Sequence, residues 1–491
     1  MAKFRLAAMN TTTISAPTQV SQIYIDGAFV EPHGTEWFDL FNPATEQLIG
    51  RVRLGDPVDA QRAVAAAKRA FADFSRSTKA ERLALLGRLH AAVLAREPDL
   101  RAAIQLEYGA PDAFARFATQ HAADAFLHAA RTLEAYEFRP RIGSAEVVME
   151  AVGVAALITP WNANAGFICN KLAAAIAAGC TAVIKPSEMS ALQTQVVLEA
   201  LHAADLPPGL VNVVNGRGDV VGAEFSTHPD VAKVSFTGST AVGKGILRAA
   251  ADTMKRVTLE LGGKSPTLLL DDADFATAIP LAVRAGFLNS GQACIAGTRI
   301  LVPEQRMPEA LRAIKSTVEA MQVGPASDPG SEIGPMVSQK QFDRVQSYIA
   351  LGIEEGASLV TGGPGRPDHL GHGWFIRPTV FADVRNDMRI AREEIFGPVL
   401  CVIGYRDEED AIAIANDTSY GLQANVHSGD PARARAVAAR LQAGRVLVNG
   451  LHHEPLAPFG GFKQSGLGRE FGVFGLTSYL EPKTLLGTIG N

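Results

Sequence analysis

Short apolar runs alternate with amphipathic or alanine-rich stretches through the middle of the chain. The runs have the length of strands, and the stretches between them have the pattern of helices. This alternation is typical of βαβ units, in which helices join parallel strands. The predicted strands are residues 152–158, 181–185, 210–214, 231–236 and 257–261, and the predicted helices are 166–178, 190–204, 218–227 and 240–251.

A second series of the same kind begins at residues 265–270. The chain is therefore predicted to be an α/β protein with two α/β domains in succession. The second series has further strands near 298–303 and 397–405, and helices near 274–288, 307–322, 338–355 and 407–416.

The ends of the chain have different patterns. Before residue 130 the pattern is helical, as at 58–74, 79–96 and 99–108. Residues 134–150 and 476–486 are predicted to be lone extended segments. Such strands commonly pair with each other or with a neighbouring subunit, so a homodimer or homotetramer is expected.

Composition narrows the class of protein. A chain of 491 residues suggests about three domains. A net charge of −5 gives no reason to expect nucleic acid as a partner. The longest apolar stretch, residues 172–184, is shorter than the roughly 18 residues of a membrane span. The first 20 residues are predicted to be a loose polar leader, without the apolar core of a signal peptide, and Met9 is an alternative start.

The cysteines, at positions 169, 180, 294 and 401, form no CxxC pair and no zinc framework. Reduced thiols, a cytoplasmic protein and no metal are expected. Cys294 lies between Gly291 and Gly297, on backbone that can approach a substrate closely. Glu260 stands just ahead of two glycines and can be aimed across a cleft, so a thiol nucleophile and a carboxylate base are candidates. The alternative for Cys294 is an inert buried thiol.

A glycine-containing turn, Phe236-Thr237-Gly238-Ser239-Thr240 with Gly243, follows a predicted strand and opens a predicted helix. Its free N–H groups and the helix dipole could face a pyrophosphate. Only two of the three glycines of the dinucleotide fingerprint are present, so a turn without a ligand is about equally consistent.

Two more segments, Ile158-Thr159-Pro160-Trp161-Asn162 and Lys185-Pro186-Ser187-Glu188, follow the carboxyl ends of predicted strands, where α/β sheets bind ligands. Lys185 and Glu188 could bind the hydroxyls of a ribose, or form a solvated ion pair. The Asn162 amide, beside Trp161, suits a developing oxyanion.

Two other motifs do not match the sites that they resemble, a phosphate-binding P-loop and a metal site. Gly262-Gly263-Lys264-Ser265 resembles the end of a phosphate-binding P-loop, but Thr258 occupies the position of its first glycine. His452-His453-Glu454 lacks a third ligand at metal spacing, although His452 remains a possible base for Cys294.

Taken together, the motifs resemble the NAD(P)-dependent aldehyde dehydrogenase family over roughly residues 22–488. The resemblance implies a Rossmann-like cofactor domain (21–130 and 151–259), an α/β catalytic domain (260–466) and a small β oligomerisation arm (131–150 and 467–491). The ordered motifs are Pro160-Trp161-Asn162, Lys185-Pro186-Ser187-Glu188, the Phe236 turn, Glu260 to Pro266, Gly291 to Cys294, Glu394-Ile395-Phe396-Gly397-Pro398 and Pro458 to Gly466.

The resemblance also implies roles. Cys294 would attack an aldehyde, and Asn162 with the Cys294 backbone N–H would hold the oxyanion while hydride leaves for the nicotinamide. Glu260 would activate the water that hydrolyses the thioester, and Lys171 with Glu470 would relay protons. The implied cofactor contacts are Ile158, Thr159, Trp161, Lys185, Ser187, Glu188, Gly218, Phe236, Gly238, Ser239, Val242, Leu261, Gly262, Glu394 and Phe396.

Three further expectations concern specificity. Glu188 favours NAD over NADP, because its carboxylate would repel a 2′-phosphate. Glu260 argues against relatives that acylate coenzyme A. Ala163 and Asn170 stand where the family commonly has aromatic residues, so the aldehyde substrate is expected to be bulky or polar. The competing hypotheses are an idle family member that only binds, and a thiol hydrolase.

Overall fold

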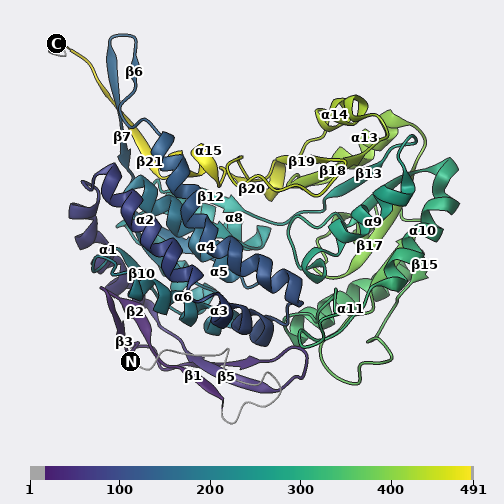
Figure 1. The fold of residues 1–491 in the computed structure, drawn as a ribbon, viewed down its shortest axis with the longest axis horizontal. Helices are drawn as coiled ribbons and strands as arrows, with labels where there is room; N and C mark the ends of the chain where they lie inside the picture. Colours follow the sequence, from purple (N-terminus) through teal and green to yellow (C-terminus); the bar gives the residue numbers. More distant parts are fainter. Residues whose placement is uncertain (1–16, 488–491) are drawn as a thin grey trace.

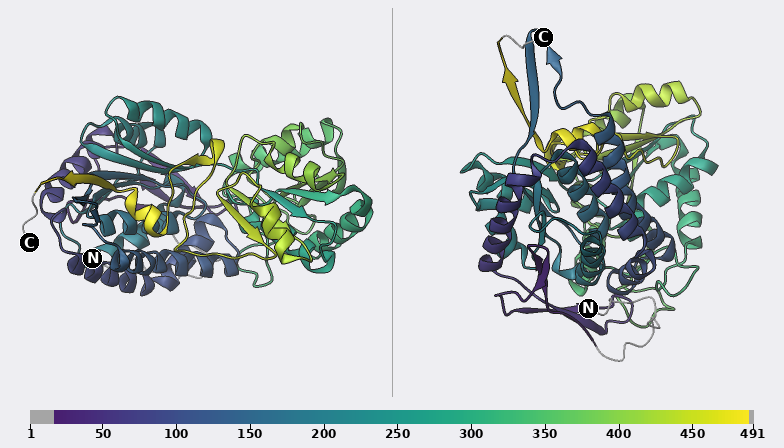
Figure 2. Two further views of the ribbon diagram at one scale, coloured as in Figure 1. Left: turned by 90° about the horizontal axis from the view of Figure 1, so that it is seen from above. Right: turned by 60° about the vertical axis from the view of Figure 1, so that its left-hand side comes forward.

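The protein forms two α/β lobes side by side, each built on its own sheet (Figures 1 and 2). The structure is a computed structural model that describes residues 17–487, so most of the predicted leader lies outside the described residues. The α/β fold class is confirmed. Across residues 17–487, no helix is both long and apolar enough to cross a membrane.

The first lobe has an eight-stranded sheet in the order β20-β12-β11-β8-β9-β10-β2-β3. Its five central strands are parallel and almost wholly buried, because helices cover both faces. The strands are β2 (Ile23–Ile25), β3 (Ala28–Val30), β8 (Val154–Ile158), β9 (Thr181–Lys185), β10 (Val211–Val213), β11 (Val231–Thr237), β12 (Arg256–Glu260) and β20 (Gly466–Leu467).

Successive residues of these strands feed two cores on opposite faces of the sheet. Ala155 and Leu157 join one core, whereas Val154, Ala156 and Ile158 join the other. The helices of this lobe are α1 (Pro57–Phe74), α2 (Lys79–Leu94), α3 (Glu97–Ala103), α4 (Asp112–Ala135), α5 (Asn164–Ala178), α6 (Ala191–Ala203), α7 (Ala223–Thr227), α8 (Thr240–Ala251) and α15 (Gly472–Thr477).

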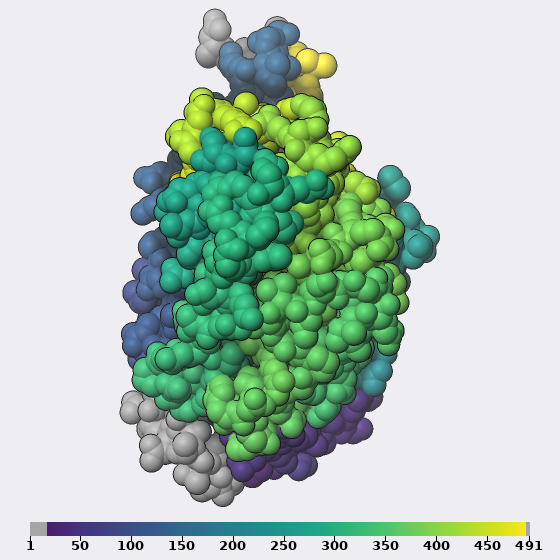
Figure 3. Space-filling view, turned by 90° about the vertical axis from the view of Figure 1, so that its right-hand side faces the viewer, coloured from purple at the N-terminus to yellow at the C-terminus, as the bar shows by residue number. Residues whose placement is uncertain are grey.

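The second lobe has a seven-stranded sheet in the order β15-β16-β17-β14-β13-β18-β19, parallel except for β15. Its residues dominate the face seen in Figure 3. The strands are β13 (Pro266–Leu269), β14 (Arg299–Pro303), β15 (Ser358–Thr361), β16 (Thr379–Ala382), β17 (Val399–Tyr405), β18 (Gln423–His427) and β19 (Arg445–Val448), and the helices are α9 (Phe275–Gly286), α10 (Met307–Ala320), α11 (Gln339–Glu354), α12 (Arg389–Arg392), α13 (Glu408–Asn416) and α14 (Pro431–Ala438).

Two small sheets complete the described chain. β7 (Ala145–Ala151) pairs with both β6 (Arg141–Ile142) and β21 (Leu480–Leu485), and this arm projects from the body of the molecule (Figure 1). The two predicted lone segments therefore pair with each other. β1 (Thr18–Val20), β4 (Trp37–Phe41) and β5 (Leu48–Arg53) form the other sheet.

The structure corrects the predictions near the N-terminus. The region before residue 130 is not uniformly helical, because residues 18–53 form β1 to β5. Ordered structure also begins within the predicted leader, at Thr18. The first extended segment starts later than expected, since α4 continues to Ala135.

Loops at the carboxyl edge of the first sheet and loops at the amino edge of the second sheet together form the site. The carboxyl ends of β8, β11 and β12 in the first lobe lead to Pro160, Gly238 and Glu260. The loop that precedes β14 in the second lobe carries Cys294. Loops from both sheets line one cavity.

Candidate active site

One cavity brings together Asn162, Glu260 and Cys294. It has about 770 Å³ of empty space. Asn162 comes from the loop after β8, Glu260 is the last residue of β12, and Cys294 lies in the loop before β14. Of the four cysteines, Cys294 is partly exposed and the other three are buried. A reactant in this cavity could therefore reach a thiol, a carboxylate and an amide.

The loop that carries Cys294 is held by strained backbone and buried amides. Asn289 and Ser290 have left-handed φ values of 52° and 58°. At Gly291, φ is +74° and an added Cβ would lie 2.2 Å from the Gly397 carbonyl oxygen, so only glycine fits. The side chain of Gln292 donates to the Pro335 carbonyl at 3.1 Å, and its oxygen accepts from another backbone N–H.

The two glycines after Glu260 have different neighbours. A Cβ at Gly263 would lie 2.5 Å from the Cys294 carbonyl oxygen, and a Cβ at Gly262 would lie 2.5 Å from the Glu394 carboxylate. Glycine at both positions lets the base segment pack against the nucleophile loop and against Glu394. The Gly263 N–H donates to Glu394 at 3.1 Å.

Burial dominates the electrostatics of the thiol. It raises the pKa of Cys294 to about 12, and the negative charges of Glu394 and Glu260 act in the same direction. Arg445 opposes this rise. The thiol is therefore protonated at neutral pH until a neighbouring group takes its proton.

Burial also raises the pKa of Glu260 well above its usual range, and the charge of Glu470 adds to this rise. Lys171 and Arg469 lower it. Both carboxyl oxygens of Glu260 are buried and make no hydrogen bond within the described chain. A carboxyl group of this kind is suited to accept a proton at neutral or higher pH.

Asn162 is 7% exposed, and its amide nitrogen donates to the Gln292 carbonyl at 2.9 Å. Asn289 returns a hydrogen bond to the Asn162 carbonyl at 3.0 Å. These bonds fix the amide donor beside the backbone that leads to Cys294, where an oxyanion on the reacting carbon would lie.

Seven of the fifteen predicted cofactor residues line the same cavity. The Trp161 ring packs edge-on against Phe396, with centroids 5.3 Å apart. Ser239 caps α8 by accepting from the Val242 N–H, which places the start of this helix at the cavity. The seven residues are Trp161, Gly238, Ser239, Leu261, Gly262, Glu394 and Phe396.

The remaining eight lie outside the lining of that cavity. The Lys185 ammonium pairs with the Glu188 carboxylate at 2.9 Å, and Gly218 lies beside Lys185. Thr159 donates to Asn164, and Ser187 caps a short helix, so these side chains support the loops. The eight are Ile158, Thr159, Lys185, Ser187, Glu188, Gly218, Phe236 and Val242.

Three residues that were not predicted as cofactor contacts also line the cavity. The Thr237 hydroxyl lines it and has no partner in the described chain. Gln341 and Arg344 of α11 line it too. Arg344 donates to the Glu394 carbonyl at 2.6 Å. Sequence reasoning missed these two because they lie within a helix that carries no glycine turn or motif.

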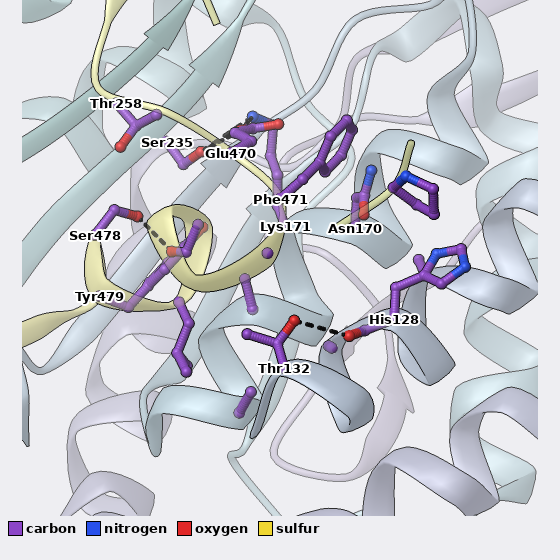
Figure 4. A pocket seen from close by; sticks show the side chains of 18 residues that line it. His128, Thr132, Asn170, Lys171, Ser235, Thr258, Glu470, Phe471, Ser478 and Tyr479 are labelled. Atoms are coloured by element: carbon purple, nitrogen blue, oxygen red, sulfur yellow. Dashed lines mark hydrogen bonds and ion pairs between the residues drawn. The ribbon is translucent and has the colours of Figure 1, made fainter. Parts of the chain in front are cut away.

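Lys171 and Glu470 contact each other in a second cavity, which has about 520 Å³ of empty space (Figure 4). The Lys171 ammonium also donates to Ser235 at 3.0 Å, and the Ser235 hydroxyl lies 3.1 Å from Glu470. Asn170 lines this second cavity, not the one that contains Cys294.

Ala163 lines a third, smaller cavity of about 220 Å³ with Tyr108, Phe114 and Trp161. In the described chain, no hydrogen bond joins His452 to Cys294. Neither does any group of three or more His, Cys, Asp or Glu side chains gather at metal-binding distance within residues 17–487.

The fold and the cavity define an α/β protein that brings a thiol, a carboxylate and an amide together between two lobes. The profile of the aldehyde dehydrogenase family matches residues 29–485. A 3-succinoylsemialdehyde-pyridine dehydrogenase of a Pseudomonas species is 45% identical over 472 residues, which cover 96% of this chain and 99% of that protein.

Solved structures of aldehyde dehydrogenases are also similar to this chain. A mutant of aldehyde dehydrogenase C from Pseudomonas syringae, complexed with NAD+ and octanal, is 45% identical with a TM-score of 0.95, over 97% of this chain and 99% of the other. An aldehyde dehydrogenase of Mycobacterium tuberculosis complexed with NAD+ is 39% identical with a TM-score of 0.94, over 97% and 100% of the two chains. The chain belongs to the aldehyde dehydrogenase family and is an enzyme that oxidises aldehydes to carboxylic acids.

Proposed function

We propose that this enzyme oxidises its aldehyde through covalent intermediates on Cys294, with NAD as the hydride acceptor. The observation that carries the proposal is the convergence of Asn162, Glu260 and Cys294 on one cavity that seven cofactor candidates also line. Neither an idle family member that only binds nor a thiol hydrolase explains why these three residues share a cavity with the cofactor candidates.

The residues act in a defined order. The Cys294 thiol gives up its proton, and its sulfur bonds to the aldehyde carbon to form a thiohemiacetal. The Asn162 amide and the Cys294 backbone N–H stabilise the oxyanion. Loss of hydride leaves a thioester. Glu260 then takes a proton from water, whose oxygen attacks the thioester carbon and releases the acid and the thiol.

When bound, NAD supplies the acceptor for that hydride. Trp161, Phe396 and the start of α8 would hold it in the cavity, and Lys185 with Glu188 would bind its adenosine ribose. A ribose 2′-hydroxyl can donate to Glu188, whereas a 2′-phosphate would be repelled, so NAD is preferred to NADP.

Lys171 and Glu470 are proposed to pass the proton from Glu260 towards solvent. Their charges act on the pKa of Glu260 in opposite directions, which supports a coupled group of three. A bulky or polar aldehyde is proposed as the substrate from the sequence alone, since Ala163 and Asn170 stand where the family commonly has aromatic residues. Both residues line cavities other than the one that contains Cys294.

The arm is proposed to join subunits into a homodimer or homotetramer. It projects from the body, and several of its β7 and β21 side chains are partly or largely exposed. Within the chain, Glu481 of β21 pairs with Arg256. A cytoplasmic location and the domain boundaries 21–130, 151–259 and 260–466 belong to the same proposal.

The test compares Cys294→Ala with Cys169→Ala, a buried cysteine outside the cavity. NADH formation from a panel of aldehydes is measured with and without coenzyme A, and NAD binding is followed by quenching of tryptophan fluorescence. Cys294→Ala should abolish oxidation and leave NAD affinity within a few-fold. Cys169→Ala should keep its activity. Substantial turnover by the first variant would remove the covalent mechanism.

A further inference from the structure

Arg445 is the first residue of β19, on the edge strand of the second sheet. Its neighbour across the strand pair is Gln423 of β18. The buried Gln423 amide donates to the Ile295 carbonyl at 3.2 Å, immediately after Cys294, and the Arg445 Nε donates to the Gln423 oxygen at 2.7 Å. One side chain therefore connects the guanidinium to the nucleophile loop.

Other contacts place Arg445 near the reacting groups, beside the residues that line their cavity. Its guanidinium carbon lies 5.3 Å from the centre of the Phe459 ring. The next residue, Gly460, lies against Glu260, because a Cβ there would be 2.7 Å from the Glu260 carboxylate. The positive charge of Arg445 also acts on the Cys294 thiol.

The charge of Arg445 is not compensated by a carboxylate. None of the ion pairs within residues 17–487 involves Arg445. Its Nη1 has one contact, with His453 Nδ1 at a long 3.5 Å. A guanidinium has five N–H donors. Nε and Nη2 of Arg445 both donate to the Gln423 oxygen and Nη1 contacts His453, so two N–H donors of this half-buried group have no partner in the described chain.

The surroundings are mainly aromatic, and the nearby carboxylates are those of Glu260 and Glu454. Phe459 packs against Phe471, with ring centroids 5.5 Å apart, and Phe471 contacts both His453 and His121. Burial lowers the pKa of His121 to about 4 and also lowers that of His453, so both rings are neutral at pH 7. The guanidinium is thus a cation among neutral aromatic and imidazole rings.

We infer that Arg445 is a specificity-determining residue that binds a carboxylate on the tail of the aldehyde, so that the favoured substrates are ω-oxo acids. A guanidinium forms strong, paired hydrogen bonds with a carboxylate, and a partly desolvated one gains most from such a partner. This inference rests on the proposed role of Cys294, which defines where the aldehyde end lies.

The experiment compares ω-oxo acids with alkyl aldehydes of the same carbon number, from butanal and 4-oxobutanoate to hexanal and 6-oxohexanoate. The readout is the ratio of kcat/KM for the two members of each pair, because an effect on the thiol alone changes both equally. The variants are Arg445→Gln, Arg445→Lys, which keeps the charge, and Arg435→Gln, an exposed arginine of α14 as the control.

The unmodified enzyme should favour the oxo acid at one or more chain lengths. Arg445→Gln should lower the ratio there by about 10- to 100-fold, mainly through KM, as expected for a lost hydrogen bond to a charged group. Arg445→Lys should restore part of the ratio, and Arg435→Gln should leave it unchanged.

An enzyme that oxidises both members of every pair equally well would overturn the inference without any variant, as would an unchanged ratio in Arg445→Gln. An enzyme that oxidises no aldehyde at all would instead contradict the proposed function. The two failures are therefore distinguishable.

Discussion

Replacing Lys171 with methionine separates two roles of its contact with Glu470, structural support and proton transfer. The Lys171 side chain is fully buried and that of Glu470 is 12% exposed. The substitution leaves the Glu470 carboxylate with one hydrogen-bond partner in the described chain, the Ser235 hydroxyl at 3.1 Å. Methionine keeps most of the volume of lysine, so little of the effect comes from a cavity.

Breaking one side of a buried ion pair typically costs about 3–5 kcal/mol, because an uncompensated charge remains in a poorly polarisable environment. We expect a loss of that size in the free energy of unfolding for Lys171→Met, and a similar loss for Glu470→Leu. The double variant removes both charges and should recover most of the loss, since neutral replacements of a buried pair are often nearly neutral or stabilising.

Urea unfolding followed by tryptophan fluorescence measures the stability part, and pre-steady-state NADH formation measures the catalytic part. If the pair relays protons, the stable double variant should still show one rapid turnover followed by slow release of acid. Single variants within about 1 kcal/mol of the unmodified protein would refute the burial argument. A double variant with normal steady turnover would refute the relay.

Three further predictions follow from buried or paired carboxylates. Glu260→Gln should slow steady turnover by roughly 10²- to 10⁴-fold, and mass spectrometry should detect an acyl adduct on Cys294. Because the pKa of Glu260 is raised, its carboxylate form is lost as pH falls, so the unmodified enzyme should lose activity towards acid pH. The rate of the variant should not show this decline at acid pH. Glu188→Gln should narrow the ratio of kcat/KM for NAD over NADP, and a preference for NADP in the unmodified enzyme would contradict the role of Glu188. Burial raises the pKa of Glu107 to about 8, so the folded state favours the protonated carboxyl. The contribution of Glu107 to the free energy of unfolding is therefore fully present below the unfolded-state pKa near 4.5 and is lost as the pH rises through about 8. Glu107→Gln should flatten that loss and cost about 1–3 kcal/mol at pH 6, because Glu107 accepts two backbone N–H bonds at the start of α6; pH-dependent urea midpoints decide it.

The five central strands of the first lobe could be predicted because they are short, mainly apolar runs with a glycine or proline nearby on at least one side. Residues 181–185 and 240–251 coincide with β9 and α8. Strand β18 in the second lobe was missed, although it is wholly buried, because Gln423, Asn425 and His427 interrupt its apolar pattern. Their buried amides bond to Ile295 and Thr267, contacts that a hydrophobic pattern does not reveal.

The short strands near the N-terminus were missed for a different reason. β1, β2 and β3 have three residues each, too few for an alternating pattern to be recognised. They are ordered because they add to larger sheets, as β2 does by pairing with β10, which lies almost 190 residues further along the chain. Such pairing depends on tertiary contacts that local sequence does not encode.

In the candidate site, too, the residues in local sequence motifs could be predicted and those placed by tertiary contacts could not. Glycine turns at strand ends predicted the segments around Gly238 and Gly262, because close approach of the backbone requires glycine and is therefore visible in the sequence. Side chains that reach the cavity from ordinary secondary structure carry no such signal, as with Gln341 and Arg344 within α11. Arg445, at the start of β19, is likewise marked by no motif.

Burial has opposite consequences for the two reacting groups of the cavity. By raising the pKa of Glu260 it makes the carboxylate a stronger base, and by raising the pKa of Cys294 to about 12 it makes the thiol a weaker acid. The thiol therefore needs a proton acceptor or a nearby positive charge before it can attack. Arg445 supplies a positive charge on the second lobe, and Lys171 supplies one that acts on Glu260 from the first. The balance between base strength and thiol acidity is thus set from both sides of the cavity, by side chains that lie outside the recognised motifs.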